Sequence, residues 1–77
     1  FSVFPNPTTQ NLINVESGNI KGNKVIRVVN AEGKNVLEKT SNESLTELDL
    51  NGLSYGLYLL SITSEDGNVV FSKFIKQ

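Results

Sequence analysis

The sequence predicts an all-β fold, a single antiparallel β-sandwich of about seven strands. Runs rich in Val, Ile, Leu, Phe and Thr alternate with clusters of Gly, Asn, Asp, Pro and Ser at fairly regular spacing along the 77 residues. This is the pattern of short strands joined by turns. A helical period is nowhere sustained. Two connections that contain Gly also have the composition of β-hairpin loops.

Each strand is expected where apolar residues alternate between two turn clusters, with bounds accurate to about two to four residues. In the sixth strand, Tyr58, Leu60 and Ile62 share one face, and in the fifth the inward side chains are Leu48 and Leu50. The last strand is ambiguous because both of its faces carry apolar residues together with a Lys. The expected ranges are Ser2 to Phe4, Asn11 to Ser17, Lys24 to Asn30, Asn35 to Thr40, Leu45 to Leu50, Gly56 to Thr63 and Asn68 to Lys76.

Two connections predict β-hairpins. The segment Asn30-Ala31-Glu32-Gly33-Lys34 places Gly33 where a type I turn followed by a bulge needs a positive φ. The segment Ser64-Glu65-Asp66-Gly67-Asn68 repeats the arrangement with Gly67. Both Gly residues are therefore expected in the left-handed conformation.

Composition excludes most chemistry. The chain has no Cys and no His, so disulfides, Ser-His and Cys-His nucleophiles and ordinary zinc sites are excluded. Glu65 and Asp66 could contribute oxygens to calcium, but a solvated hairpin tip is the better interpretation. We therefore expect no catalytic, cofactor or metal residues.

Charge and hydropathy exclude two classes of partner. The net charge of -1 gives no electrostatic reason to bind nucleic acid. No apolar run approaches the roughly 20 residues that a membrane-spanning helix needs, so no membrane insertion is expected. The chain starts at Phe1 inside an expected strand, without an initiator Met, which suggests one domain, residues 1–77, excised from a longer protein.

Three motifs carry the remaining information. In Pro5-Asn6-Pro7 two prolines fix φ and remove two amide donors, which predicts a rigid corner after the first strand. In the segment from Leu53 to Tyr58, the Tyr stands where immunoglobulin-like sandwiches use a Tyr hydroxyl to tie the preceding loop to the fold. Gly56 then permits a sharp entry into the sixth strand.

The third motif is the ending Phe71-Ser72-Lys73-Phe74-Ile75-Lys76-Gln77, which allows two interpretations. Lys73 and Lys76 could be charged gatekeepers that stop an edge strand from pairing with neighbours. Alternatively, the segment is a recognition signal, in which a receptor captures Gln77 by adding a strand alongside it. Both interpretations remain open at this point.

In this order, the motifs resemble the C-terminal sorting domain of type IX secretion cargo proteins. The resemblance covers Val3 to Gln77 and rests on an aromatic followed by Pro-Asn-Pro-Thr, on Leu-x-x-Gly-x-Tyr at residues 53–58 and on the terminal strand with its lysines. The hairpin at Asn30 is also similar, although Asp is usual there. An Asn side chain can cap the same turn.

The resemblance implies a C-terminal export signal that directs an N-terminally attached cargo protein across the outer membrane. The implied partners are the type IX translocon and a sortase-like peptidase that removes the domain. The implied location is secreted or at the cell surface, reached through the periplasm of a Gram-negative bacterium. The implied export-recognition residues are Lys73, Phe74, Ile75, Lys76 and Gln77, and the scaffold residues are Pro5, Asn6, Pro7, Gly33, Leu53, Gly56 and Tyr58.

Two other classes of function remain open. Immunoglobulin-like modules attached to secreted enzymes often bind carbohydrate or adhere to surfaces. Such a module would use aromatic side chains, yet Trp is absent and Tyr55 is the only obvious loop aromatic. A passive spacer is the third possibility, and it predicts neither binding nor export.

Overall fold

The structure is a computed structural model that describes residues 1–9 and 11–77. Each strand lies within one residue of its expected bounds at either end. None of the described residues forms a helix that could cross a bilayer. The strands are β1 (Ser2–Phe4), β2 (Leu12–Glu16), β3 (Lys24–Asn30), β4 (Asn35–Ser41), β5 (Leu45–Asp49), β6 (Gly56–Thr63) and β7 (Val69–Lys76).

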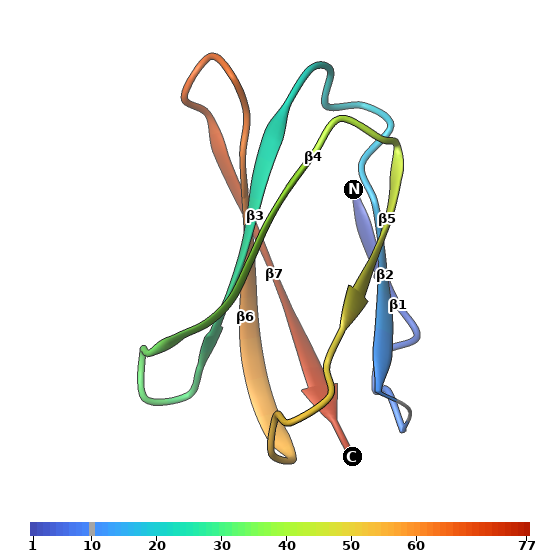
Figure 1. Cartoon of the computed structure of the whole chain (residues 1–77), viewed down its shortest axis with the longest axis vertical. Helices are drawn as coiled ribbons and strands as arrows, with labels where there is room; N and C mark the ends of the chain where they lie inside the picture. The colour runs from blue at the N-terminus through green and yellow to red at the C-terminus, as the bar shows by residue number, and fades with distance from the viewer. Residues whose placement is uncertain (10) are drawn as a thin grey trace.

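The strands form two antiparallel sheets that face each other (Figure 1). One sheet has the order β1-β2-β5 and the other has the order β4-β3-β6-β7. The ladder between β6 and β7 runs without a register shift from Gly56↔Lys76 to Thr63↔Val69. The expected all-β sandwich of seven strands is confirmed, and β7 is an edge strand of the larger sheet.

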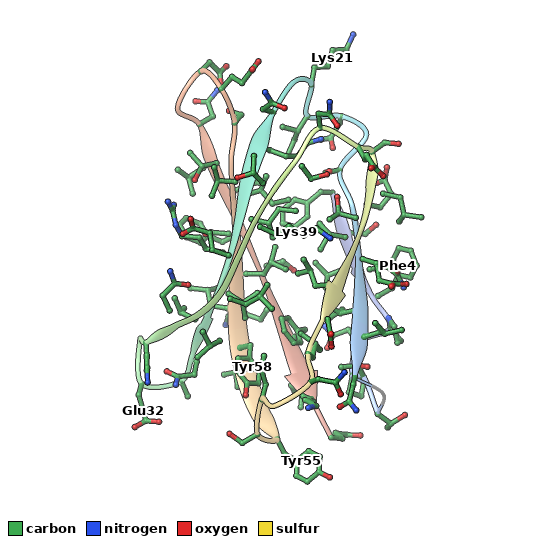
Figure 2. All side chains as sticks on the ribbon, in the orientation of Figure 1. Phe4, Lys21, Glu32, Lys39, Tyr55 and Tyr58 are labelled. Atoms are coloured by element: carbon green, nitrogen blue, oxygen red, sulfur yellow. The ribbon has the colours of Figure 1, made fainter. Side chains whose placement is uncertain are left out.

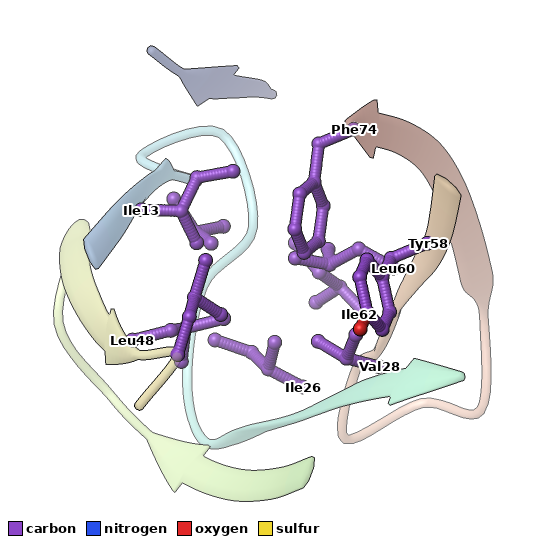
Figure 3. Packing of buried hydrophobic residues seen from close by; sticks show 10 residues of the cluster. Ile13, Ile26, Val28, Leu48, Tyr58, Leu60, Ile62 and Phe74 are labelled. Carbon is purple, nitrogen blue, oxygen red and sulfur yellow. The ribbon is translucent and has the colours of Figure 1, made fainter. Parts of the chain in front are cut away.

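The core lies between the sheets, where side chains of β2 and β5 meet those of β3, β6 and β7 (Figure 3). The inward faces expected for β5 and β6 are confirmed, because Leu48, Leu50, Tyr58, Leu60 and Ile62 are all buried. Each aliphatic side chain buried in this way stabilises the fold by about 1.5–3 kcal/mol relative to exposure. Because the chain has no disulfide, this core holds the two sheets together.

Both hairpins have the expected turn geometry. Gly33 has a φ of 86° and Gly67 a φ of 88°. In the first hairpin, Oδ1 of Asn30 accepts hydrogen bonds from the backbone N–H groups of Glu32 at 3.0 Å and Lys34 at 2.9 Å. The Asn therefore caps the turn through its side chain, as predicted.

Candidate recognition site at the terminal strand

The strand β7 buries one face and presents the other to solvent. Phe74 and Lys76 point into the sandwich, where they are 0% and 5% exposed. Lys73 and Ile75 point outward and are exposed. The ambiguity of this strand is thus resolved by strict alternation, and the residues expected to act in export lie on opposite sides of the sheet.

Lys76 is a buried cation at the end of the sandwich. Its Nζ donates to the backbone carbonyl of Leu50 at 3.1 Å and to that of Leu53 at 2.7 Å. The Nζ also lies 6.0 Å from the centre of the Tyr55 ring. The expectation that Lys76 is an exposed gatekeeper charge is wrong. A buried ammonium needs such acceptors, and here they tie β7 to the loop between β5 and β6.

Residues of the N-terminal corner cover the edge of β7. The side chain of Asn6 donates from Nδ2 to the carbonyl of Lys73 at 3.1 Å and accepts from the N–H of Ile75 at 3.1 Å. Two residues later, the N–H of Thr8 donates to the carbonyl of Ile75 at 2.9 Å, and the N–H of Gln77 donates to the carbonyl of Thr8 at 2.8 Å. We call Asn6 and Thr8 the edge clip.

The edge clip stands where a further strand would otherwise pair. The side-chain amide of Asn6 makes the two hydrogen bonds that one residue of a paired strand would make. Thr8 forms a parallel β-bridge with Lys76. Pro5 and Pro7 flank Asn6, and the peptide bonds that precede both prolines are cis. The edge beside Gln77 is therefore already occupied, which contradicts the expectation that a receptor adds a strand directly at that residue.

The loop before β6 is fixed as the sequence predicts. The Tyr58 hydroxyl donates to the backbone carbonyl of Ser54 at 2.5 Å, and the Tyr58 ring stacks on Phe74 with ring centres 5.4 Å apart. Gly56 enters β6 with a φ of 144°, a conformation that disfavours any side chain. Leu53 packs against the core while its carbonyl accepts from the buried ammonium described above.

The outer face of β6 and β7 carries a shallow apolar depression. Its volume is about 310 Å³, and Lys73 lies among its lining residues. The ladder places Leu57 opposite Ile75 and Leu59 opposite Lys73 on this face. Gly33 lines the same depression from the β3–β4 hairpin. The depression brings together one exposed cation and several apolar side chains.

The acidic side chains of the described residues do not assemble a metal-binding cluster. Within the described ranges, no group of three or more His, Cys, Asp or Glu side chains could hold a metal ion. Asp66 instead builds its own turn, since its carboxylate accepts from the Ser64 hydroxyl and from the Asn68 amide. Tyr55 projects from one end of the molecule, whereas Tyr58 points inside (Figure 2).

Sequence reasoning missed two features of the site. It did not place Asn6 on the edge of β7, and it did not recognise Lys76 as buried. For Lys76 a signal existed, because an unbroken alternation puts it on the same face as the apolar Phe74. For Asn6 no local signal existed, because its two bonds reach 67 and 69 residues along the chain.

The chain is similar to part of a curated enzyme. The chain is 34% identical over 74 residues to the ulvan lyase NLR42 of Nonlabens ulvanivorans. The aligned region covers 95% of this chain and 14% of the relative. The similarity is thus to a small part of a much longer enzyme.

A family model covers nearly the whole chain. The model describes the secretion system C-terminal sorting domain and matches residues 2–77. This range includes the Pro-Asn-Pro corner, both hairpins, the Tyr58 loop and the whole of β7. The chain therefore belongs to the secretion system C-terminal sorting domain family, whose members carry a sorting signal and are not catalytic.

Proposed function

We propose that this domain is a C-terminal export signal that directs an N-terminally attached cargo protein across the outer membrane through the type IX secretion system. The observation that carries the proposal is the family match over residues 2–77. The relative supports it as well, since only 14% of that lyase corresponds to this chain and the rest is available as cargo. In this view the domain is one unit excised from a longer secreted protein.

The export machinery would read the outward side of β7. Lys73 and Ile75 are exposed there, and Gln77 is exposed just after the strand. Phe74 and Lys76 serve the same signal indirectly, because their buried contacts hold the strand in place. Recognition would therefore use a cation beside an apolar depression rather than a deep pocket.

The proposal includes the fate of the domain. After transport, a sortase-like peptidase would remove it by cutting upstream of Phe1, and the cargo would be released or kept at the cell surface. Export of the cargo with its attached domain would start in the periplasm of a Gram-negative bacterium. The folded sandwich begins with β1, so a cut upstream of Phe1 would separate the cargo and leave the sandwich intact.

The test is a reporter fusion. The domain is attached to the C-terminus of a periplasmic fluorescent reporter in a bacterium that has the type IX machinery, and the reporter is measured in the medium, on the surface and in the periplasm. Export of the reporter is expected. Lys73→Glu should retain the reporter in the periplasm, whereas the same charge change at the exposed Lys39 on β4 (Figure 2), which lines neither the depression nor the edge of β7, should leave export unchanged. A reporter that stays in the periplasm with the unmodified domain would contradict the proposal.

A carbohydrate-binding or adhesion module is the second candidate. The observation in its favour is Tyr55, which is 79% exposed in the loop before β6. Glycan-array binding in the micromolar range that Tyr55→Ala abolishes would support this candidate. A passive spacer predicts that the domain gives neither glycan binding nor export of the reporter.

A further inference from the structure

Half of the outer edge of β7 has no partner strand. Ile75 directs both its N–H and its C=O away from β6, toward the edge clip. At the other end of the strand, Ser64 pairs with Asn68 by a hydrogen bond that closes the β6–β7 hairpin. Ladder hydrogen bonds alternate along an antiparallel pair. Both ends therefore give the same result: the odd-numbered residues of β7 point their backbone groups at the open edge.

The edge clip satisfies only the C-terminal part of this edge. It bonds to the carbonyl of Lys73 and to the backbone groups of Ile75 and Gln77. In the described part of the chain, the backbone groups of Val69 and Phe71 that face away from β6 form no hydrogen bond. The open edge, residues 69–73, therefore carries two complete sets of N–H and C=O groups and the N–H of Lys73.

Apolar side chains flank the open edge on both faces. Phe71 is 62% exposed and Val69 is 46% exposed on the outer face, and Val70 is 38% exposed on the inner face. Val70 lines a groove of about 550 Å³ together with Ile20 and Ile62. Soluble proteins usually blunt an apolar edge with charge, proline or a covering segment. This chain covers one half and leaves the other half exposed.

We propose that the open edge of β7 is a strand-addition site that accepts an extended segment of a protein of the export machinery. The inference rests on the proposed function. Main-chain hydrogen bonds to Val69, Phe71 and Lys73 would supply affinity, and the flanking side chains would supply specificity. The edge clip sets the limit of the site, because it blocks pairing beyond Lys73.

The surroundings of the site define the chemistry of its partner. A residue packed against Phe71 must be apolar. Near the hairpin, Glu65 and Asp66 line the groove, and the Ser64 hydroxyl holds the pKa of the Asp66 carboxyl below its ordinary value. Lys21 lines the same groove, so two carboxylates face one ammonium. The excess of negative charge favours Lys or Arg at the end of the partner segment that lies beside Val69.

A second copy of this chain fits the open edge less well. Two copies could pair with Phe71 on a two-fold axis, but the contact would comprise only residues 69–73 of each copy. Such a contact is far smaller than the roughly 1,200 Å² that stable interfaces bury. The length of the open edge therefore favours a longer partner that also contacts the outer face.

The test separates the backbone of Phe71 from its side chain. Phe71→Pro removes an N–H that has no partner in the fold, so it breaks no ladder bond. Phe71→Ala also removes the ring but keeps the N–H. In the reporter fusion, Phe71→Pro should reduce export about tenfold relative to Phe71→Ala, because a strand-addition bond is lost. Thermal unfolding of both variants shows whether each is folded.

A second measurement covers the case in which Phe71→Pro does not fold. Hydrogen exchange of the unmodified domain is recorded with and without purified type IX translocon. The amides of Val69, Phe71 and Lys73 should exchange at least about tenfold more slowly in the complex. Binding that leaves these three amides unchanged would overturn the inference.

Other outcomes also decide between the proposals. Equal export of Phe71→Pro and Phe71→Ala, both folded, would overturn strand addition, while export of the unmodified fusion would still support the proposed function.

Analytical ultracentrifugation tests whether a second copy of this chain binds the open edge. A dimer that Phe71→Pro dissociates and Phe71→Ala retains would assign the edge to self-association and overturn the proposed occupant.

Discussion

Asn6 and Ile75 are joined by a hydrogen bond in which the backbone N–H of Ile75 donates to Oδ1 of Asn6 at 3.1 Å. The bond connects the first turn of the chain to its last strand. Because the Nδ2 of the same side chain donates to Lys73, one amide acts as a short piece of neighbouring strand. The Pro-Asn-Pro corner is thus a part of the terminal strand's environment.

Asn6→Ala is predicted to destabilise the domain by about 1–2 kcal/mol, since two hydrogen bonds to an edge backbone are lost. Urea unfolding of the isolated domain measures the change. Asn42→Ala is the control, because Asn42 is also an exposed Asn outside a strand. A midpoint of Asn6→Ala equal to that of the control would show that the edge clip contributes nothing to stability.

Lys76→Met is predicted to destabilise the domain by about 2 kcal/mol, because the carbonyls of Leu50 and Leu53 lose their donor. The matched variant Lys73→Met removes an exposed charge and should change the unfolding free energy by less than about 0.5 kcal/mol. Export should show the opposite order among folded molecules, with Lys73→Met the more defective. If both variants lose export without losing stability, then Lys76 acts as more than a structural cation.

Tyr58→Phe removes the hydroxyl that bonds to Ser54 and keeps the ring that stacks on Phe74. The expected loss is about 1–1.5 kcal/mol of unfolding free energy. Tyr55→Phe is the control, since its ring is largely exposed and its loss should be negligible. Thermal unfolding of the two variants side by side gives the comparison, and equal midpoints would contradict the predicted role of the hydroxyl.

Gly33→Val is predicted to cost about 1–3 kcal/mol, because a β-branched residue is strained at a φ of 86°. Space is not the reason, since nothing lies within 4 Å of the position that a Cβ would take. Ala31→Val in the same hairpin has no positive φ to maintain and should cost less. Similar costs at the two positions would point to the bulk of Val rather than to the backbone.

The β6–β7 hairpin is predicted to weaken in acid. The Ser64 hydroxyl lowers the pKa of Asp66 from its ordinary value of 3.8, so the ionised carboxylate stabilises the folded hairpin. Its contribution is complete above pH 3.8 and is lost as the pH falls through the lower pKa of the folded state. Asp66→Asn should remove this part of the pH dependence. Unfolding of both proteins followed downward from pH 5 tests the prediction, which fails if the two curves stay parallel.

The strands and the core could be predicted because they depend on local alternation. Leu60 and Ile62 repeat at the period of a strand, and Gly33 marks a turn by its own backbone preference. The hydrogen bond of Tyr58 could also be predicted, because its acceptor lies only four residues away. These features need no knowledge of how distant segments meet.

The environment of the terminal strand could not be predicted in the same way. Asn6 contacts β7 across 67 and 69 residues of the chain, so no neighbouring residue indicates its role. Lys76 was expected in water because lysines are rarely buried. Its long side chain instead carries the ammonium to two carbonyls at the end of the sandwich. In both cases the deciding contact is tertiary.

The edge clip also has a mechanical consequence. Residues 6–8 run parallel to the end of β7 and are bonded to it at successive positions. Tension applied between the two ends of the domain would therefore load these bonds together, in shear, and would not peel them apart one at a time. A domain pulled from one side while it is held at the other would resist through its first and last segments before the core is strained.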